Sequence, residues 1–167
     1  MNRNLRLSKA RRRTKRVQYL HPALEVLEER TMLATVAWIN PAGGDWSTPG
    51  NWDANRIPGA IDDAVIPFTG ITVTHSATVT DSISSLTSQA GVTLSGGTLN
   101  IAGHADVDGL FTLSNATLGS ATVDKGTTIQ AASGGALNGV TLNGDLDLTT
   151  NFGANVTIVN GLTLGGA

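Results

Sequence analysis

A seven-residue pattern that occurs four times constrains the fold of this chain more than any other feature. It reads Thr-Leu-Ser-Gly-Gly-Thr-Leu at residues 93–99, and close copies follow at 112–118, 136–142 and 158–164. The second residues of the copies, Leu94, Leu113, Leu137 and Val159, are 19, 24 and 22 residues apart. Self-similarity at such a period is typical of a solenoid, in which a single repeat cannot bury its own apolar face.

Each copy predicts two short strands separated by a corner, because apolar residues flank a short polar or Gly-rich link. We therefore expect an all-β fold: a single-stranded right-handed parallel β-helix, or β-solenoid, with rungs of about 20–24 residues. If the copies stack in register, their third residues form one polar ladder. These residues are Ser95, Ser114, Asn138 and Asn160.

Charge divides the chain into two parts. Residues 1–30 hold nine Lys or Arg and three Glu, whereas residues 31–167 hold two basic residues and ten Asp. The first part therefore carries a net charge of +6 and the second a net charge of −8. Cysteine is absent, which excludes disulfides, thiolate metal sites and cysteine nucleophiles.

The stretch 3–16 is basic and contains no acidic residue. A targeting segment, a nucleic-acid-binding arm and a solvated disordered tail are three interpretations of such a run. We expect a disordered targeting leader and no nucleic-acid binding, because no folded basic module or interleaved aromatic residues follow it. Polar residues interrupt the stretch 19–33, so an ordinary secretory signal is excluded, and no apolar run is long enough for a transmembrane helix.

A short amphipathic helix is expected over residues 22–33, because Leu20, Leu24 and Leu27 lie near helical spacing and Pro22 suits a first turn. Residues 27–34, which overlap the end of this helix, resemble the LEPR-XLL motif of exported bacterial proteins, with Glu29 in place of the usual Pro or Asp and Met32 in place of Leu. The residues that match the motif positions are Leu27, Glu28, Glu29, Arg30, Met32 and Leu33. This resemblance implies recognition of the leader by export machinery and a location at the cell surface or outside the cell, and it implies no reaction.

All three tryptophans lie in the turn-rich block 35–68, at Trp38, Trp46 and Trp52. The first rung of a solenoid needs an atypical unit to cover it, and bulky rings suit a cap of this kind. The block also resembles the opening of autotransporter-like β-helical proteins. The residues that carry this likeness are Gly44, Asp45, Trp46, Asn51, Trp52, Pro58, Asp62, Asp63, Val65 and Ile66. A second interpretation makes the three tryptophans a platform for sugar rings.

The sequence predicts three segments: a leader at 1–34, the Trp-rich cap at 35–68 and solenoid repeats at 69–167. The rungs are expected to begin near residue 71, where apolar and hydroxyl residues alternate up to residue 86 with the period of a half-buried strand. The chain stops just after its fourth copy without a charged or bulky cap, so we expect it to be the first part of a longer solenoid.

Polysaccharide-cleaving β-helix proteins gather carboxylates on one strand face. The candidate groups here are Asp106, Asp108, Asp124, Asp145 and Asp147, with Lys125, His75 and His104 as partners. Each Asp lies where a turn is expected, and the pair Asp62 and Asp63 provides too few oxygens for a calcium ion. We therefore expect no catalytic, cofactor-binding or metal-binding residues.

The expected function is that of a non-catalytic exported module, structural or adhesive, whose strand faces present Thr and Ser to surface polysaccharide or to other surface proteins. The alternative is a fragment of a polysaccharide-binding or polysaccharide-degrading β-helix protein.

Overall fold

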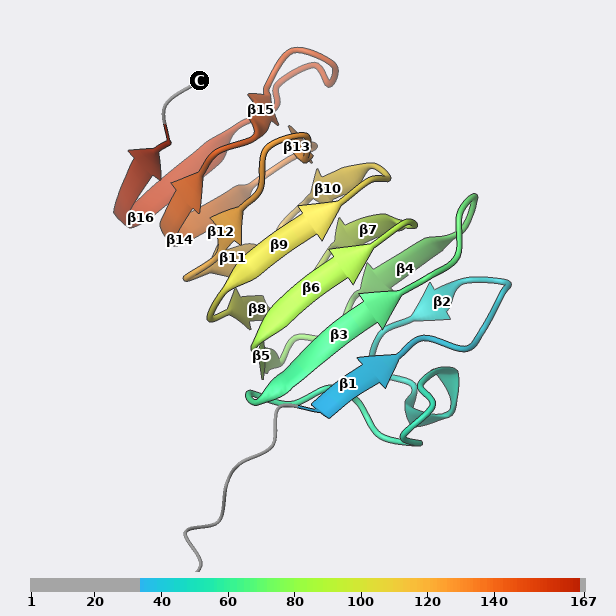
Figure 1. Cartoon of the computed structure of the whole chain (residues 1–167). Coiled ribbons are helices and arrows are strands. Elements are labelled where there is room, and N and C mark those ends of the chain that lie inside the picture. The colour runs from blue at the N-terminus through green and yellow to red at the C-terminus, as the bar shows by residue number, and fades with distance from the viewer. Residues whose placement is uncertain (1–33, 166–167) are drawn as a thin grey trace, which may run out of the picture. The chain divides into compact units, whose positions relative to one another are not determined.

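The structure is a computed structural model that describes residues 34–165. The basic leader, the helix expected at 22–33 and the LEPR-XLL-like motif lie outside the described residues. The described part is an all-β solenoid of parallel coils, as the repeats predicted (Figure 1). One 3₁₀ turn, η1 (Pro49–Asn51), accompanies the strands.

The strands stack into three faces. The first face runs through β1 (Ala34–Ala37), β3 (Asp62–Ile66), β6 (Ser85–Ser88), β9 (His104–Val107) and β12 (Thr122–Val123). The second face runs through β2 (Gly44–Asp45), β4 (Thr72–His75), β7 (Gly91–Leu94), β10 (Phe111–Leu113), β13 (Thr128–Ala131) and β15 (Asp145–Asp147). The third face begins with β5 (Thr80–Ile83), β8 (Thr98–Ile101) and β11 (Thr117–Gly119).

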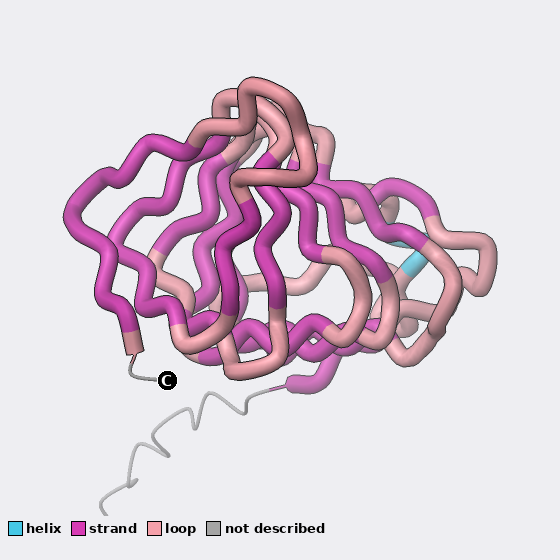
Figure 2. The backbone as a smooth tube through the Cα atoms, turned by 90° about the horizontal axis from the view of Figure 1, so that it is seen from above, coloured by secondary structure: helices cyan, strands magenta, loops and turns pink. Residues whose placement is uncertain are grey.

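Two long strands, β14 (Gly135–Leu142) and β16 (Val156–Leu164), join the third face to the first. The start of β14 pairs with β11 and its end pairs with β12, so each long strand turns the corner between the two faces. In Figure 1 the first-face strands lie side by side in front of the second-face strands, and Figure 2 shows the coils following one another.

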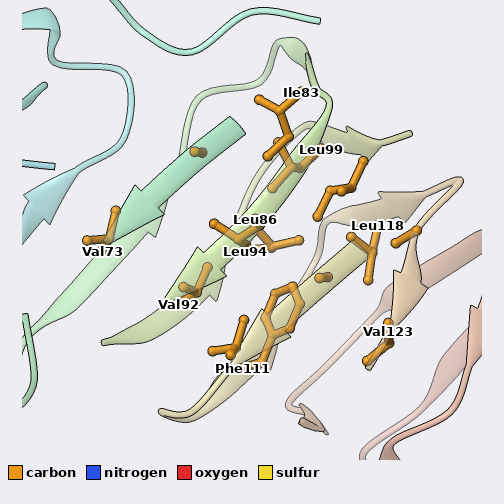
Figure 3. Close-up of a cluster of buried hydrophobic side chains, with 14 of the residues drawn as sticks. Val73, Ile83, Leu86, Val92, Leu94, Leu99, Phe111, Leu118 and Val123 are labelled. Atoms are coloured by element: carbon orange, nitrogen blue, oxygen red, sulfur yellow. The ribbon is translucent and has the colours of Figure 1, made fainter. Parts of the chain in front are cut away.

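Each coil takes about 19 residues, slightly fewer than the repeat spacing suggested. On the second face, Val73, Val92, Phe111 and Ile129 occupy the same position in successive coils. Their side chains point inward and are buried. The hydroxyl or other polar residues that alternate with them along each strand point outward. Figure 3 shows how these columns meet residues such as Leu99 and Leu118 from the third face in the core.

The register corrects the alignment of the four copies. Leu113 pairs with Leu94 as predicted, but its partner in the next coil is Ala131, whereas Leu137 pairs with Leu118. The third and fourth copies therefore lie at a different corner of the coil from the first and second. Every corner joins two apolar strands through a polar link, so spacing alone does not distinguish one corner from another.

The single polar ladder predicted from the third residues of the copies is accordingly wrong. Asn160 Nδ2 donates to Asn138 Oδ1 at 2.7 Å, so these two form a pair at their own corner. Ser114 belongs to another corner, where its hydroxyl lies 3.5 Å from that of Ser133.

One corner glycine shows why this position admits no side chain. Gly97 has a φ of 62°, and an added Cβ would collide with the backbone oxygens of Val79 and Ala77 in the preceding coil. Both the positive φ and the close approach of two coils therefore require glycine there.

The Trp-rich block supplies strands of the solenoid itself. Its strand β1 pairs with β3, and its strands β3 and β2 pair with β6 and β4 of the following coil. The first coil therefore begins before residue 71, earlier than the alternation pattern predicted.

Replacing an inward leucine should test the core. Leu118 is buried, so Leu118→Ala should lower the free energy of unfolding by about 3 kcal/mol through lost burial and a residual cavity. Leu110→Ala is the matched control, because Leu110 is 52% exposed and should cost below about 1 kcal/mol. Urea unfolding followed by circular dichroism measures both, and equal losses would contradict the assigned core.

Candidate functional site

The proposed tryptophan platform for sugars is wrong, because all three indole rings are inside the core. Trp38, Trp46 and Trp52 are each no more than 1% exposed. Trp52 lies edge-on to both others, with ring centroids 5.0 Å from Trp38 and 4.7 Å from Trp46. Stacking against a sugar needs an open ring face, and none of these rings has one.

Polar atoms of the same block fix the rings in place. Trp38 Nε1 donates to the carbonyl oxygen of Asn40 at 2.7 Å, and Trp52 Nε1 donates to that of Trp46 at 2.8 Å. Within residues 34–165, Trp46 Nε1 has no hydrogen-bond acceptor. The block is thus a packed aromatic cluster that extends the core of the solenoid.

Asp62 and Asp63, weighed as cation ligands, are engaged by protein groups. Arg56 donates to both carboxylate oxygens of Asp62, and the Gly59 N–H donates to Oδ2 at 2.7 Å. The hydrogen bonds from Arg56, which have the largest effect, and the one from Gly59 hold the pKa of Asp62 below its ordinary value. Asp63 accepts a hydrogen bond from the Ser85 hydroxyl at 2.6 Å.

The five aspartates considered for polysaccharide cleavage are divided between two faces. Asp106 pairs with Thr87 on the first face, and Asp124 follows β12 on that face. Asp145 and Asp147 lie on the second face, in β15. Asp108 follows β9 and is exposed, and Lys125 is exposed beside Asp124. The register therefore does not gather the five carboxylates in one column.

Two of these aspartates have local partners. His104 Nδ1 lies 2.7 Å from Asp124 Oδ1, and both side chains are accessible to solvent. Hydrogen bonds from Thr150 and Thr149 lower the pKa of Asp147, which therefore stays ionised in a polar turn. The first pair links neighbouring coils on the first face, and the hydrogen bonds of Asp147 stabilise the turn after β15.

His75 is buried beneath the second face. Its Nδ1 lies 3.0 Å from the carbonyl oxygen of Gly96, and its Nε2 lies 3.0 Å from Asp81 Oδ2. A carbonyl oxygen only accepts, so Nδ1 donates to Gly96. The centroid of its ring lies 6.2 Å from that of Trp46. The ring is buried and contacts none of the five candidate aspartates.

Residues 34–165 contain no pocket and no group of three or more His, Cys, Asp or Glu side chains placed to hold a metal ion. The same range contains no helix long and apolar enough to cross a membrane.

The most regular outward-facing feature is a set of threonine columns. On the second face, Thr74, Thr93 and Thr112 occupy equivalent positions in three successive coils. The third face carries a second column, formed by Thr80, Thr98 and Thr117. The first face carries a third column, formed by Thr122, Thr141 and Thr163.

The second-face column is polar along its whole length. It begins at Asp45 and continues past its three threonines to Gln130 and Asp147. The third-face column is interrupted by Ala136, and the first-face column begins beside His104. Successive side chains along such a column are about 4.8 Å apart, the spacing of neighbouring strands.

The hydroxyl groups of the columns are available to a partner. Among the described residues, the threonine hydroxyls that hydrogen-bond to protein groups are those of Thr127, Thr149 and Thr150, and none of these belongs to a column. Alternation of hydroxyl and apolar residues indicated strands that present Thr outward. The columns themselves were not predicted, because they depend on which coil positions are in register.

Comparisons of the chain with protein-family models, with curated proteins and with solved structures found no match.

Removing the Asp62 carboxylate should destabilise the protein in a pH-dependent way. We expect Asp62→Ala to lower the free energy of unfolding by about 2 kcal/mol at neutral pH, because the Arg56 and Gly59 donors lose their acceptor. The folded-state pKa of Asp62 is lowered, so its contribution is complete above the unfolded value of about 3.9. That contribution is lost as the pH falls through the folded-state pKa.

Urea titrations of the original protein and of Asp62→Ala at a series of pH values measure the difference in their free energies of unfolding. Asp106→Ala is the control, because Asp106 is exposed and should change stability by less than about 0.5 kcal/mol. A difference for Asp62→Ala that grows on acidification would contradict the assignment.

Proposed function

We propose that this chain is a non-catalytic exported β-solenoid, a structural or adhesive module that holds surface polysaccharide along its second face. The observation that carries the proposal is the unbroken polar column on that face, with Thr74, Thr93 and Thr112 in register. Repetition of one uncharged group at a fixed spacing suits a polymeric partner that itself repeats.

Threonine suits the surface of a polysaccharide for two reasons. Its hydroxyl both donates and accepts, as sugar hydroxyls do, and its methyl group contacts the C–H groups of the sugar ring. Each contact is weak, but contacts along one polymer reinforce one another because later contacts form within the same complex.

The leader supports export of the module. It has a basic run and a stretch that resembles the LEPR-XLL motif. In the exported bacterial proteins that carry this motif, a basic leader of this kind precedes a repeat-rich β body. Export machinery is therefore the partner that we propose for residues 1–34, and polysaccharide is the partner that we propose for the solenoid.

Geometry favours holding a polysaccharide over cleaving it. Hydrolysis of a glycosidic bond requires two carboxylates on either side of the bond, separated by about 5 to 10 Å. The column on the second face has three threonines and Gln130 between its two carboxylates, Asp45 and Asp147, which stand at opposite ends.

Loss of the central hydroxyls should weaken adhesion. The triple variant Thr74→Val, Thr93→Val and Thr112→Val keeps the branched shape at each position and removes the hydroxyl groups. We expect retention on immobilised bacterial surface polysaccharides to fall at least tenfold. Circular dichroism should show an unchanged β fold.

A second triple variant on the third face provides the matched control: Thr80→Val, Thr98→Val and Thr117→Val. It makes the same chemical change on a column that Ala136 interrupts, so retention should stay within about twofold of the original protein. Equal losses in the two triple variants, or retention unaffected by either, would exclude the second face as the binding surface.

Export should depend on the LEPR-XLL-like motif. In a secreting bacterial host we expect the full chain at the cell surface or in the medium, and the double variant Leu27→Ala and Leu33→Ala inside the cell. Leu20→Ala, outside the motif, should be exported normally. Cell fractionation and N-terminal sequencing measure the outcome, and an intracellular protein that still begins at Met1 would contradict export.

A further inference from the structure

Two polar side chains occupy core positions that are apolar in the next coil. On the second face His75 pairs with Leu94, and on the third face Asp81 pairs with Leu99. Both leucines are buried in the core that Figure 3 shows, and the side chains of His75 and Asp81 are 0% and 11% exposed. The coil of β4 and β5 therefore holds a histidine and an aspartate where the next coil holds two leucines.

Both ring nitrogens of His75 face hydrogen-bond acceptors. Nδ1 lies 3.0 Å from the carbonyl oxygen of Gly96, and Nε2 lies 3.0 Å from Asp81 Oδ2. A carbonyl oxygen and an ionised carboxylate only accept, so both contacts are hydrogen bonds when each ring nitrogen carries a proton. Imidazole is a stronger base than a carboxylate, so the second proton belongs on Nε2. The geometry therefore fits a buried imidazolium–carboxylate pair.

This pair lies at the corner where the second face turns into the third. The Ser95 N–H donates to the His75 carbonyl oxygen, and the Thr98 N–H donates to that of Val79, each at 2.9 Å. Between these two bonds the coils approach closely, because a Cβ added to Gly96 would lie 2.4 Å from a backbone oxygen of the preceding coil. The His75 ring thus joins two coils through Nδ1 and two faces of its own coil through Nε2.

Trp46 lies on the other side of the pair, in the preceding coil. Its N–H donates to the Thr74 carbonyl oxygen at 2.9 Å, and its ring centroid is 6.2 Å from that of His75. The pair is therefore located where the tryptophan cluster meets the regular coils. An indole is a donor only, so Trp46 offers the imidazolium no acceptor.

The other charged groups on the neighbouring strands have partners of their own. On β2, Asp45 Oδ2 accepts a hydrogen bond from the Ser76 hydroxyl at 2.5 Å. On β3, Asp62 and Asp63 are held by the hydrogen bonds described above. Apart from His75, strands β4, β7 and β8 contain no ionisable side chain, and β5 contains Asp81 alone. Asp81 is therefore the group on these strands that balances a charge on His75.

From this arrangement we propose that His75 and Asp81 form a proton-dependent clasp, which closes the corner at Gly96 when the ring is doubly protonated and releases it when the ring is neutral. A neutral ring has one donor for two acceptors, so one of the two hydrogen bonds is lost and the buried carboxylate loses its counter-charge. Asp81 is the partly exposed member of the pair, so the proton leaves to solvent past its carboxylate.

The leucines of the next coil explain why the pair acts as a switch. A buried ion pair stabilises a fold no better than apolar side chains of similar volume, and often less well. Leu94 and Leu99 close their own coil at every pH, whereas a histidine in the same position makes closure depend on pH. The clasp acts on the fold itself, whatever the outer faces bind.

Urea unfolding of the full chain tests the pH dependence. The closed clasp needs its second proton, so the urea midpoint of the original protein should fall by about 0.5 M or more between about pH 5 and about pH 8, where imidazole loses its charge. The double variant His75→Leu and Asp81→Leu continues the two leucine columns and should show no such fall.

A second double variant, His104→Gln and Asp124→Asn, is the matched control. It removes a histidine–aspartate pair whose side chains are 70% and 30% exposed, and it should keep the pH dependence of the original protein. An equal fall in the original protein and the double leucine variant, or no fall in the original protein, would overturn the proposal.

Nitrogen NMR of the histidine-labelled full chain tests the proton directly. The ring signals absent from the double leucine variant identify His75, and at about pH 5 both of its nitrogens should carry a proton. As the pH rises and one proton leaves, hydrogen-exchange protection factors at Ser95 and Thr98 should fall at least tenfold. Ala132, whose N–H donates to the Leu113 carbonyl oxygen in a later coil, should keep its protection. An unprotonated Nε2 in acid, or equal losses at Ser95 and Ala132, would overturn the clasp.

Discussion

Stacking of inward apolar side chains from coil to coil is the interaction on which the whole solenoid depends. No coil of about 19 residues encloses a core alone, so each inward residue is buried only because equivalent residues lie above and below it. Val92 shows this dependence, since it is buried between Val73 and Phe111 of the neighbouring coils. The outward positions follow from the same register, because side chains alternate along a strand. Fixing the core columns therefore fixes the threonine columns, and a slip of one residue would move hydroxyls inward.

The repeat was sufficient to predict the fold class but not the register. Two-residue alternation identified the strands, and the polar links identified the corners. Leu113 and Leu137 share a local motif but occupy different corners, because a coil has several similar corners and loops of unequal length between them. The choice between corners depends on contacts with the preceding coil. Gly97 illustrates this, since its close neighbours are backbone oxygens about 20 residues earlier in the chain.

Burial decided the role of the tryptophans, and sequence pattern alone left two interpretations open. A ring among Gly, Pro and Asn residues suits both a surface platform and a packed cap. In the structure Trp52 is a core residue. It makes edge-on contacts with Trp38 and Trp46, and its Nε1 donates a hydrogen bond to the Trp46 carbonyl oxygen. The aspartates show the converse case. They were candidates for carboxylates gathered on one strand face, but Asp106 and Asp145 belong to different faces because corners lie between them.

The first and last described strands of the solenoid differ in the segments that pair with them. At β1, residues 51–53 turn back and pair antiparallel with residues 37–39, and three indole rings fill the core beneath them. At β16 the apolar columns continue to the last described strand, and its corner is formed by Asn160 and Gly161, with φ values of 54° and 89°. Asn160 donates to Asn138 in the preceding coil, so a polar side chain as well as a glycine shapes this corner. Residues 51–53 thus pair with the outer edge of the first coil, whereas β16 is held by its pairing with β14.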